Sequence, residues 1–282
     1  MLRPEPGESA GRPGWPGLRL AVAAVAVALM VGAMTPAAHG AARLAARFAA
    51  AMNSMPGTAS PVPKAMPAGR SFGGTPTVGA LFTQTPAGRL GTHFCTASVV
   101  ASPHADLAVT AAHCVARHRG TIAFVPGWQD GSAPYGVWTV RKVVVDRAWA
   151  SSSSIDDDVA FLVIGPAHGV RLQQVTGAER VGIGQLGSLP VQVIGYPDGE
   201  GDPVTCDGRT SVPRPHQLEF DCGRYTDGTS GGPFLMNAGP RTGTVIGVIG
   251  GYQQGGDVAQ ISYAAEFGPN IARLYRTACA AG

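Results

Sequence analysis

The chain has 282 residues, of which 45% are hydrophobic and 14% charged, and it contains 40 Gly and 23 Pro. This is enough apolar material for one large or two small cores, and too few charges for a disordered polyelectrolyte. The Gly and Pro residues follow no Gly-X-Y period and there are no heptads, which excludes collagen, coiled-coil and helical-repeat proteins. Residues 77–282 hold 14 basic and 16 acidic side chains, a balance that argues against a nucleic-acid partner.

Residues 1–40 have the pattern of a signal peptide. Three arginines precede an uncharged stretch from Leu20 to Ala38, and small residues continue to Gly40, where a signal peptidase would cut. We therefore expect cleavage and a secreted, extracellular protein. The same 19-residue stretch is long enough to remain as an uncleaved membrane anchor. That is the one way in which we expect a contact with a membrane.

Residues 55–74 are mostly Pro, Gly, Ala and Ser, which predicts a linker or pro-segment. From Val78 onward the sequence alternates short apolar runs with Gly, Pro, Asp and Ser, a pattern of antiparallel strands closed into barrels or a sandwich. The expected strands are Val78–Phe82, Thr92–Val100, Leu107–Thr110, Ile122–Val125, Val137–Val145, Val159–Ile164, Leu189–Ile194, Gln217–Phe220, Thr244–Ile249 and Val258–Ala264. Apolar residues at three-to-four spacing predict one helix, Asn270–Cys279.

Five cysteines in an exported chain most simply form two disulfides and leave one over. Cys95 and Cys114 are 19 residues apart, Cys206 and Cys222 are 16 apart, and each pair lies within one run of strand-like sequence. We expect these two pairs to be bonded. Cys279 is then free or intermolecular.

Two strings supply a candidate base and a candidate carboxylate. Residues 110–114 read Thr-Ala-Ala-His-Cys. A lone histidine is more often structural, but the alanines and the half-cystine would hold the imidazole of His113 in a fixed turn. Residues 156–158 are three aspartates, and for the first two we expect a solvated loop. Asp158 directly precedes an apolar run, so a half-desolvated carboxylate there suits the orientation of an imidazole.

The third string, residues 228–233, reads Gly-Thr-Ser-Gly-Gly-Pro and supplies a candidate nucleophile, Ser230. Glycines around a serine can form an ordinary turn, but Gly228 would also let backbone N–H groups point into a cleft beside the hydroxyl as an oxyanion site. The string fits the nucleophile elbow of α/β-hydrolases as well. In that fold the base follows the serine, whereas all seven histidines here precede Ser230. That fold therefore leaves Ser230 without a base.

The order His113, Asp158, Ser230 resembles that of the chymotrypsin/trypsin-like serine peptidases. The match covers about residues 77–282 and combines the three strings with a cysteine placed to bond the one beside His113. The resemblance implies an all-β fold of two antiparallel Greek-key β-barrels, with the active site in the cleft between them and a short C-terminal helix.

The expected segments are a signal peptide (1–40), a pro-segment or linker (41–76), an N-terminal barrel with the base and the carboxylate (77–170), and a C-terminal barrel with the nucleophile and the helix (171–282). The resemblance implies that His113 is the general base, Asp158 its orienter and Ser230 the nucleophile, with the N–H groups of Gly228 and Ser230 as the oxyanion hole. We expect a secreted serine endopeptidase that acts as a monomer on protein or peptide substrates and needs no cofactor. We expect no metal either, because His113, Cys114 and His118 lack the usual ligand spacing.

Two departures from the trypsin type concern activation. Trypsin-like members carry Asp immediately before the nucleophile, where it pairs with a newly cut amino terminus, and here that position is Thr229. The segment Thr77–Phe82 lacks an Ile-Val-Gly-Gly start and looks more like bacterial glutamyl-endopeptidase-type relatives. We therefore expect local hydrogen bonds to order the oxyanion loop without a proteolytic trigger. The Thr229 hydroxyl is a candidate for such a bond.

Substrate preference in this family is set by the segment before the nucleophile and by the strand Val248–Tyr252, which makes Arg224, Thr226 and Gly250 the candidate specificity residues. Arg224 lies six residues before Ser230, where trypsin-like enzymes hold the acid that selects Lys or Arg. Arg224 with Thr226 would favour an acidic side chain, and an exposed arginine on a loop explains the position equally well.

Two other functions stay open on this sequence. A binding protein can use a peptidase scaffold without activity, and an esterase-type serine hydrolase can use the same acyl-enzyme chemistry. A fluorophosphonate probe mapped to Ser230 separates both hydrolases from the binding protein. Casein compared with a short-chain ester separates the endopeptidase from the esterase.

Overall fold

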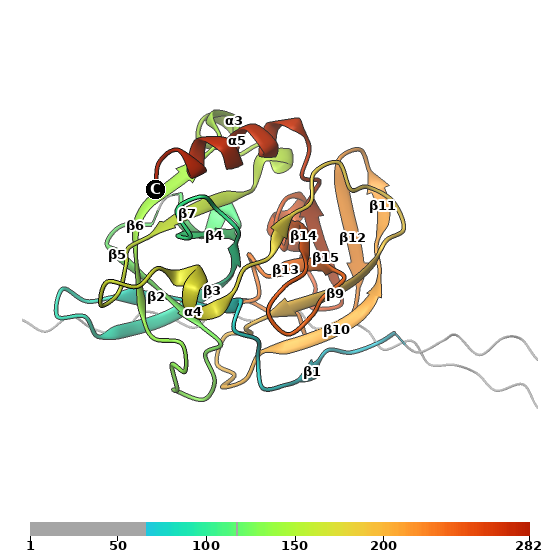
Figure 1. Ribbon diagram of the computed structural model, residues 1–282. Coiled ribbons are helices and arrows are strands. Elements are labelled where there is room, and N and C mark those ends of the chain that lie inside the picture. The colour runs from blue at the N-terminus through green and yellow to red at the C-terminus, as the bar shows by residue number, and fades with distance from the viewer. Residues whose placement is uncertain (1–65, 117) are drawn as a thin grey trace, which may run out of the picture. The chain divides into compact units, whose positions relative to one another are not determined.

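The structure, a computed structural model, describes residues 66–116 and 118–282 (Figure 1). The expected signal peptide and most of the expected pro-segment lie outside these residues. Within them the protein is mostly β with a short C-terminal helix, which confirms the predicted fold class. None of the helices described is both long and apolar enough to cross a membrane.

The first half of the described chain forms a closed barrel with the strand order β2-β3-β4-β7-β6-β5. Its strands are β2 (Val78–Gln84), β3 (Leu90–Val100), β4 (Leu107–Thr110), β5 (Thr121–Pro126), β6 (Trp138–Val145) and β7 (Ala160–Ile164). Successive side chains of a strand point to opposite faces. On β7, Leu162 accordingly packs inside the barrel, while Phe161 faces a second cluster that includes residues of the C-terminal helix. Because both faces of β7 are buried, all five residues of this strand are apolar.

The second half forms two sheets in place of the second closed barrel that the sequence predicted. A six-stranded sheet has the order β1-β10-β9-β13-β14-β8, and a three-stranded sheet has the order β11-β12-β15. The larger sheet is open, with the short strands β1 and β8 at its two edges, each paired on one side only. The strands are β1 (Arg70–Ser71), β8 (Arg180–Val181), β9 (Pro190–Gly195), β10 (Val204–Arg209), β11 (Ser211–Arg214), β12 (Gln217–Asp221), β13 (Pro233–Met236), β14 (Thr244–Val248) and β15 (Ile261–Ala265).

The two ends of the described chain pack on opposite halves of the fold. Strand β1 pairs with β10 of the second half, although it lies before the domain boundary expected at residue 77. Helix α5 (Pro269–Cys279) lies against β6 and β7 of the first barrel (Figure 1). Its buried side chains include Ile271 and Leu274, and the Tyr275 hydroxyl donates a hydrogen bond to the carbonyl of Ala101.

Short helices lie in several of the connections between strands, in both halves of the fold. They are α2 (Ala112–Val115), α3 (Arg147–Ser152), η1 (Ile155–Asp157), α4 (Leu172–Thr176) and η2 (Tyr252–Gly255). Helix α2 directly follows β4, and η1 leads into β7. Because β4 and β7 are hydrogen-bonded neighbours, the ends of these two short helices lie close together. This arrangement brings the first two predicted site residues into contact.

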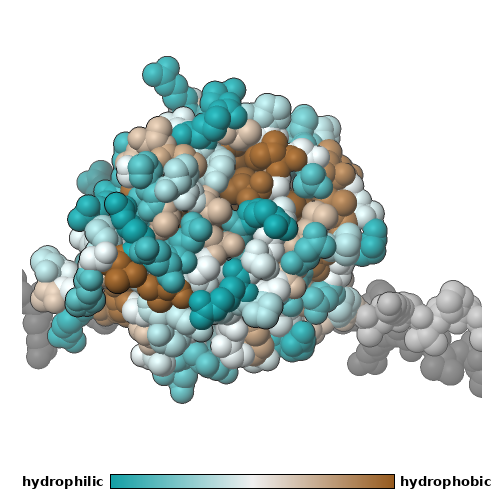
Figure 2. Space-filling view, in the orientation of Figure 1, coloured by the Kyte–Doolittle hydropathy of each residue, from teal (hydrophilic) through white to brown (hydrophobic). Residues whose placement is uncertain are grey.

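Both expected disulfides are present, Cys95–Cys114 and Cys206–Cys222, and Cys279 is free. The surface shows no single large apolar area on the face in Figure 2, where hydrophobic residues are separated by hydrophilic ones. The large hydrophobic side chains that remain exposed in the described part are Met66, Leu90, Val137, Ile155, Val170, Ile183, Leu186, Val212 and Val258. They are spread over many elements, as is usual for a folded protein.

Candidate active site

His113 lies in helix α2, where small buried alanines and a disulfide fix its position. Ala111 and Ala112 are fully buried, and Cys114 is bonded to Cys95 on β3. The His113 side chain is 14% exposed, and its Nδ1 lies 2.8 Å from an oxygen of the Asp158 carboxylate. A carboxylate oxygen only accepts hydrogen bonds, so Nδ1 carries the proton and Nε2 is left as the acceptor in the neutral ring.

Asp158 is fully buried between η1 and β7 and accepts three hydrogen bonds. The backbone N–H of His113 donates to Oδ1 at 2.8 Å, and Oδ2 accepts both from the His113 ring and from the Gly251 N–H at 2.8 Å. A buried carboxylate is tolerated only when such donors replace its water. Asp158 therefore sets both the tautomer and the orientation of the imidazole.

The expectation of a solvated loop for the first two aspartates was wrong for Asp157. Asp157 is buried, where it accepts hydrogen bonds from the hydroxyl of Ser154 at 2.7 Å and the side-chain amide of Asn270 at 2.7 Å. Asp156 is half-buried and accepts from the Gln217 amide at 2.7 Å. The start of α5 and strand β12 close over this turn, contacts that a local acidic pattern cannot reveal.

Ser230 lies in a tight loop between residues 226 and 232. Gly228 and Gly231 both adopt positive φ, +88° and +82°, which favours glycine at each. At Gly231 a Cβ would also lie 2.1 Å from the Thr110 hydroxyl and 2.2 Å from the Thr96 carbonyl. The loop thus packs directly on strands β3 and β4, the strands that carry the half-cystine Cys95 and lead to His113.

Local hydrogen bonds use three of the backbone amides of this loop and leave those of Gly228 and Ser230 without an acceptor in the described chain. The N–H groups of Thr229, Gly231 and Gly232 donate to backbone carbonyls at 3.2, 2.7 and 2.9 Å. Among the described residues, the N–H groups of Gly228 and Ser230 have no such partner. These are the two amides that the resemblance predicted as the oxyanion hole.

Thr229 replaces the activation aspartate of trypsin-like members and is 2% exposed. Its hydroxyl donates to the Thr226 carbonyl at 2.6 Å, which also accepts from the Thr229 N–H. The side chain of Thr229 thus closes the loop on itself. In this structure the loop is ordered without an ion pair at that position.

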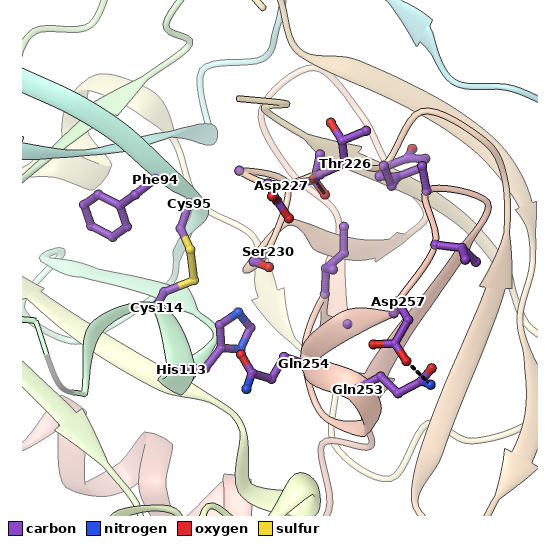
Figure 3. Close-up of a pocket in the computed structure, with 18 residues that line it drawn as sticks. Phe94, Cys95, His113, Cys114, Thr226, Asp227, Ser230, Gln253, Gln254 and Asp257 are labelled. Atoms are coloured by element: carbon purple, nitrogen blue, oxygen red, sulfur yellow. Dashed lines mark hydrogen bonds between the residues drawn. A yellow bond between two sulfur atoms is a disulfide. The ribbon is translucent and has the colours of Figure 1, made fainter. Parts of the chain in front are cut away.

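His113 and Ser230 line one open pocket of about 850 Å³ (Figure 3). The Cys95–Cys114 disulfide lines one side, and η2 with the residues that follow it lines the other. Asp227 and Asp257 are in the lining, whereas no Lys or Arg of the described chain is. Asp257 accepts a hydrogen bond from the side chain of Gln253. Among the described residues of the lining, His113 is the one with a basic ring.

The three predicted specificity residues have different positions. Thr226 lines the pocket, whereas Arg224 and Gly250 do not. The Arg224 guanidinium forms an ion pair with Glu200 at 2.6 Å and donates to the Gly69 carbonyl at 3.2 Å. Gly250 packs against Asp158, since a Cβ there would lie 3.0 Å from its Oδ2. The expected preference for an acidic side chain depended on Arg224 in the pocket, and the ion pair removes that support.

Sequence reasoning missed several residues of the site. Gly251 donates to Asp158 through its backbone, so no residue-type pattern could reveal it. Gln253, Gln254 and Asp257 line the pocket from a loop without any recognisable motif. Their proximity to His113 follows from the packing of two halves that are far apart in sequence.

The residues around His113 do not fit a metal ion. Cys95, His113 and Cys114 offer ligand atoms within 4.8 Å of one another. The two sulfurs, however, are joined in a disulfide, and a metal needs free thiolates. This group therefore offers a single imidazole, which is already hydrogen-bonded to Asp158.

The sequence matches no known protein-family profile and no curated protein at a significant level. Solved structures do match. Protease Anisep from Arthrobacter nicotinovorans has 25% identity and a TM-score of 0.65, covering 75% of this chain and 99% of its own. This chain has a chymotrypsin-type serine protease fold.

Two further chymotrypsin-type structures extend the comparison. The thermostable serine protease AL20 from an extremophilic microorganism has 24% identity and a TM-score of 0.64, with 74% of this chain and 99% of that chain covered. A Glu endopeptidase has 16% identity and a TM-score of 0.59, with 78% and 100% covered. The chymotrypsin fold therefore spans the described part of the chain, and its neighbours include bacterial proteases, as the sequence predicted.

Proposed function

We propose that this protein is a secreted serine endopeptidase that hydrolyses peptide bonds through an acyl-enzyme. The observation that carries the proposal is one pocket that holds a carboxylate-bound imidazole, a serine and the backbone N–H groups of Gly228 and Ser230, which are unpaired within the described chain. Each has a separate task in acyl transfer, and together they make a complete set. Two disulfides support an oxidising destination for the chain.

In the first half-reaction Nε2 of His113 takes the proton of the Ser230 hydroxyl as Oγ attacks the substrate carbonyl. The negative charge that develops on the carbonyl oxygen is stabilised by the N–H groups of Gly228 and Ser230. Asp158 stabilises the imidazolium through Nδ1–H and does not itself take the proton. His113 then returns its proton to the leaving amine, and Ser230 is left acylated.

In the second half-reaction water replaces the amine. His113 removes a proton from the water, which attacks the acyl carbonyl, and the same two amides stabilise the tetrahedral intermediate. His113 then protonates Ser230 Oγ as the acid product leaves. Apart from this water, each step uses only the side chains and amides named above.

The deciding experiment is covalent labelling with a fluorophosphonate, followed by mass-spectrometric mapping of the adduct. We expect the adduct on Ser230 and no labelling of Ser230→Ala. The unlabelled parent protein should also hydrolyse casein. Relative to the parent, kcat should be reduced by roughly 10⁶ in Ser230→Ala. Labelling without casein hydrolysis but with turnover of a short-chain ester would indicate the esterase. A folded protein that is not labelled at all would indicate a binding protein.

A further inference from the structure

A second histidine, His93, lies beneath the oxyanion loop and has no part in the chemistry above. It is on β3, is only 9% exposed, and its Nε2 lies 3.1 Å from the Cys95 carbonyl. A carbonyl only accepts, so Nε2 carries a proton. Three aromatic rings surround the imidazole, those of Phe82 at 5.6 Å, Trp128 at 6.2 Å and Tyr196 at 6.4 Å between ring centres.

The edge of this imidazole touches the backbone of Gly228. A Cβ built on Gly228 would lie 2.9 Å from Cε1 of His93, so no side chain fits between them. Next to this contact, the Thr96 hydroxyl donates to the Gly228 carbonyl at 3.0 Å, and the Thr96 N–H donates to the Ser230 carbonyl at 2.8 Å. Strand β3 therefore supports the loop through Thr96 and His93, neither of which lines the pocket. His93 is the titratable member of that support.

We propose that His93 is a positioning residue that holds the Gly228 N–H in its catalytic place while its imidazole is neutral, and releases it when a second proton binds. The proposal rests on the proposed function, because it assigns a support to that site's oxyanion amide. A charged imidazolium in an aromatic enclosure must gain water or a counter-ion. The backbone of Gly228 is the wall that has to move.

The groups around His93 determine the direction of its titration. Burial lowers its pKa, against smaller opposing effects from the Cys95 carbonyl and the Asp198 carboxylate. Tyr196 is a buried phenol whose pKa is raised, so it stays neutral. Asp227 precedes Gly228, and its carbonyl accepts from the Asp198 N–H at 2.7 Å. The neutral form of His93 thus prevails at neutral pH, and the charged form gains as the pH falls.

The first test is the acid limb of kcat/KM on a small amide substrate. Protonation of either His113 or His93 should abolish activity, so the limb should approach a slope of about 2 at its acid end. In His93→Gln, whose amide still donates to the Cys95 carbonyl, the slope should be about 1. His93→Ala should lower kcat at least tenfold with KM nearly unchanged, since the oxyanion contact forms in the transition state. His93→Gln should restore part of that loss.

His104→Gln, at an exposed histidine, is the matched control and should keep the slope of the parent. A slope of 1 in the parent, or an unchanged slope in His93→Gln, would overturn the proposal.

The second test does not depend on turnover. In a Ser230→Ala background, nuclear magnetic resonance should show the Gly228 amide shifting with the same midpoint as the Cε1–H of His93. The shift should be absent when His93→Gln is added. A Gly228 amide whose chemical shift does not change as His93 titrates would overturn the inference, whether or not the protein hydrolyses peptides. Failure of fluorophosphonate labelling would instead count against the proposed function alone.

Discussion

The Asp158 carboxylate shows how much of this site depends on single atoms. Both of its oxygens accept hydrogen bonds, one from the backbone N–H of His113 and the other from the His113 ring and Gly251. An amide in the same place would present one NH₂ group, which donates where the site needs an acceptor. The imidazole would then lose its tautomer while keeping its position.

Asp158→Asn should therefore lower kcat by roughly 10⁴ at neutral pH, the size of effect known for this substitution in such triads. Steady-state kinetics on a peptide amide measures it. Asp156→Asn, at a half-buried neighbour that faces Gln217, is the matched control and should keep kcat within a few-fold. If both variants lost activity alike, the turn as a whole and not the tautomer would be responsible.

The charges in the pocket lead to a prediction about the cleaved bond. Asp227 and Asp257 line the pocket and Arg224 is held outside it by Glu200, so we expect basic side chains to be preferred over acidic ones. Each exposed charge contributes at most about 1 kcal/mol, or roughly fivefold in kcat/KM. A peptide-library digest read by mass spectrometry measures the preference. It should weaken in Asp227→Asn and Asp257→Asn and at high salt, and frequent cleavage after Glu would contradict it.

Strand β1 has only two residues, yet it joins the start of the described chain to the second half of the fold. Beside its pairing with β10, the Gly69 N–H donates to the Gly223 carbonyl at 2.8 Å, and the Gly223 N–H donates to the Pro67 carbonyl at 2.9 Å. Gly223 is two residues from Tyr225, in the wall of the pocket. Residues 67–71 are thus part of the folded protein and contact the chain segment that leads into the pocket wall.

A protein that starts at Thr77 should accordingly be less stable than one that starts at Met66. We expect a loss of about 2 kcal/mol, a few net hydrogen bonds, which corresponds to a fall in Tm of roughly 4–8 °C. Differential scanning calorimetry measures it. Arg70→Ala is the control, because its ion pair with Asp207 joins side chains that are 65% and 64% exposed and should matter little. Equal Tm values for the two starts would show that β1 is dispensable.

This also changes what such a pair of proteins says about activation. From the sequence, a large difference in kcat/KM between the two starts would mean that a free amino terminus orders the site. With β1 present, a modest loss of activity in the shorter protein follows from the missing strand. The Thr229 hydroxyl, bonded to the Thr226 carbonyl, remains the local support of the loop.

The ten strands expected from the sequence all overlap strands of the structure, because each is an apolar run between turn residues. The strands that were missed are short or have a mixed pattern. β1 and β8 have two residues each and exist through partners far along the chain, such as Thr205 for Arg70. β10 contains Asp207 and Gly208, which interrupt its apolar pattern.

The residues of the site also fall into those that the sequence predicted and those that it did not. His113, Asp158 and Ser230 stand in strings whose residue types point to their chemistry. Their supports, such as the Gly251 N–H and the ring of His93, act through backbone atoms or through contacts between the two halves. Those contacts depend on tertiary packing, which no local pattern specifies.

At the scale of the whole molecule, each end of the described chain packs on the half to which it does not belong in sequence. This arrangement predicts cooperative unfolding. β1 packs on the second half and α5 on the first, and one apolar cluster contains residues from both halves together with α5. We expect one calorimetric transition, with equal calorimetric and van't Hoff enthalpies. Two resolved transitions would contradict this.

Ending the chain at Gly268 tests the same coupling. It removes Ile271, Leu274 and Ala278 from the shared cluster, a loss of about 4 kcal/mol by area and roughly 8–16 °C in Tm. Intrinsic fluorescence and far-UV circular dichroism should then report the same lowered midpoint. An unchanged midpoint would show that α5 does not couple the halves.

The disulfide beside His113 bears on when the proposed activity would begin. Cys114 directly follows the proposed base, and its bond to Cys95 closes a loop of 19 residues, a constraint that contributes about 3 kcal/mol. Thiols in the cytosol are kept reduced, so on the proposed secretion a newly made chain lacks this constraint until export. The proposed activity would then reach its full level only after oxidation, outside the cell and away from its proteins.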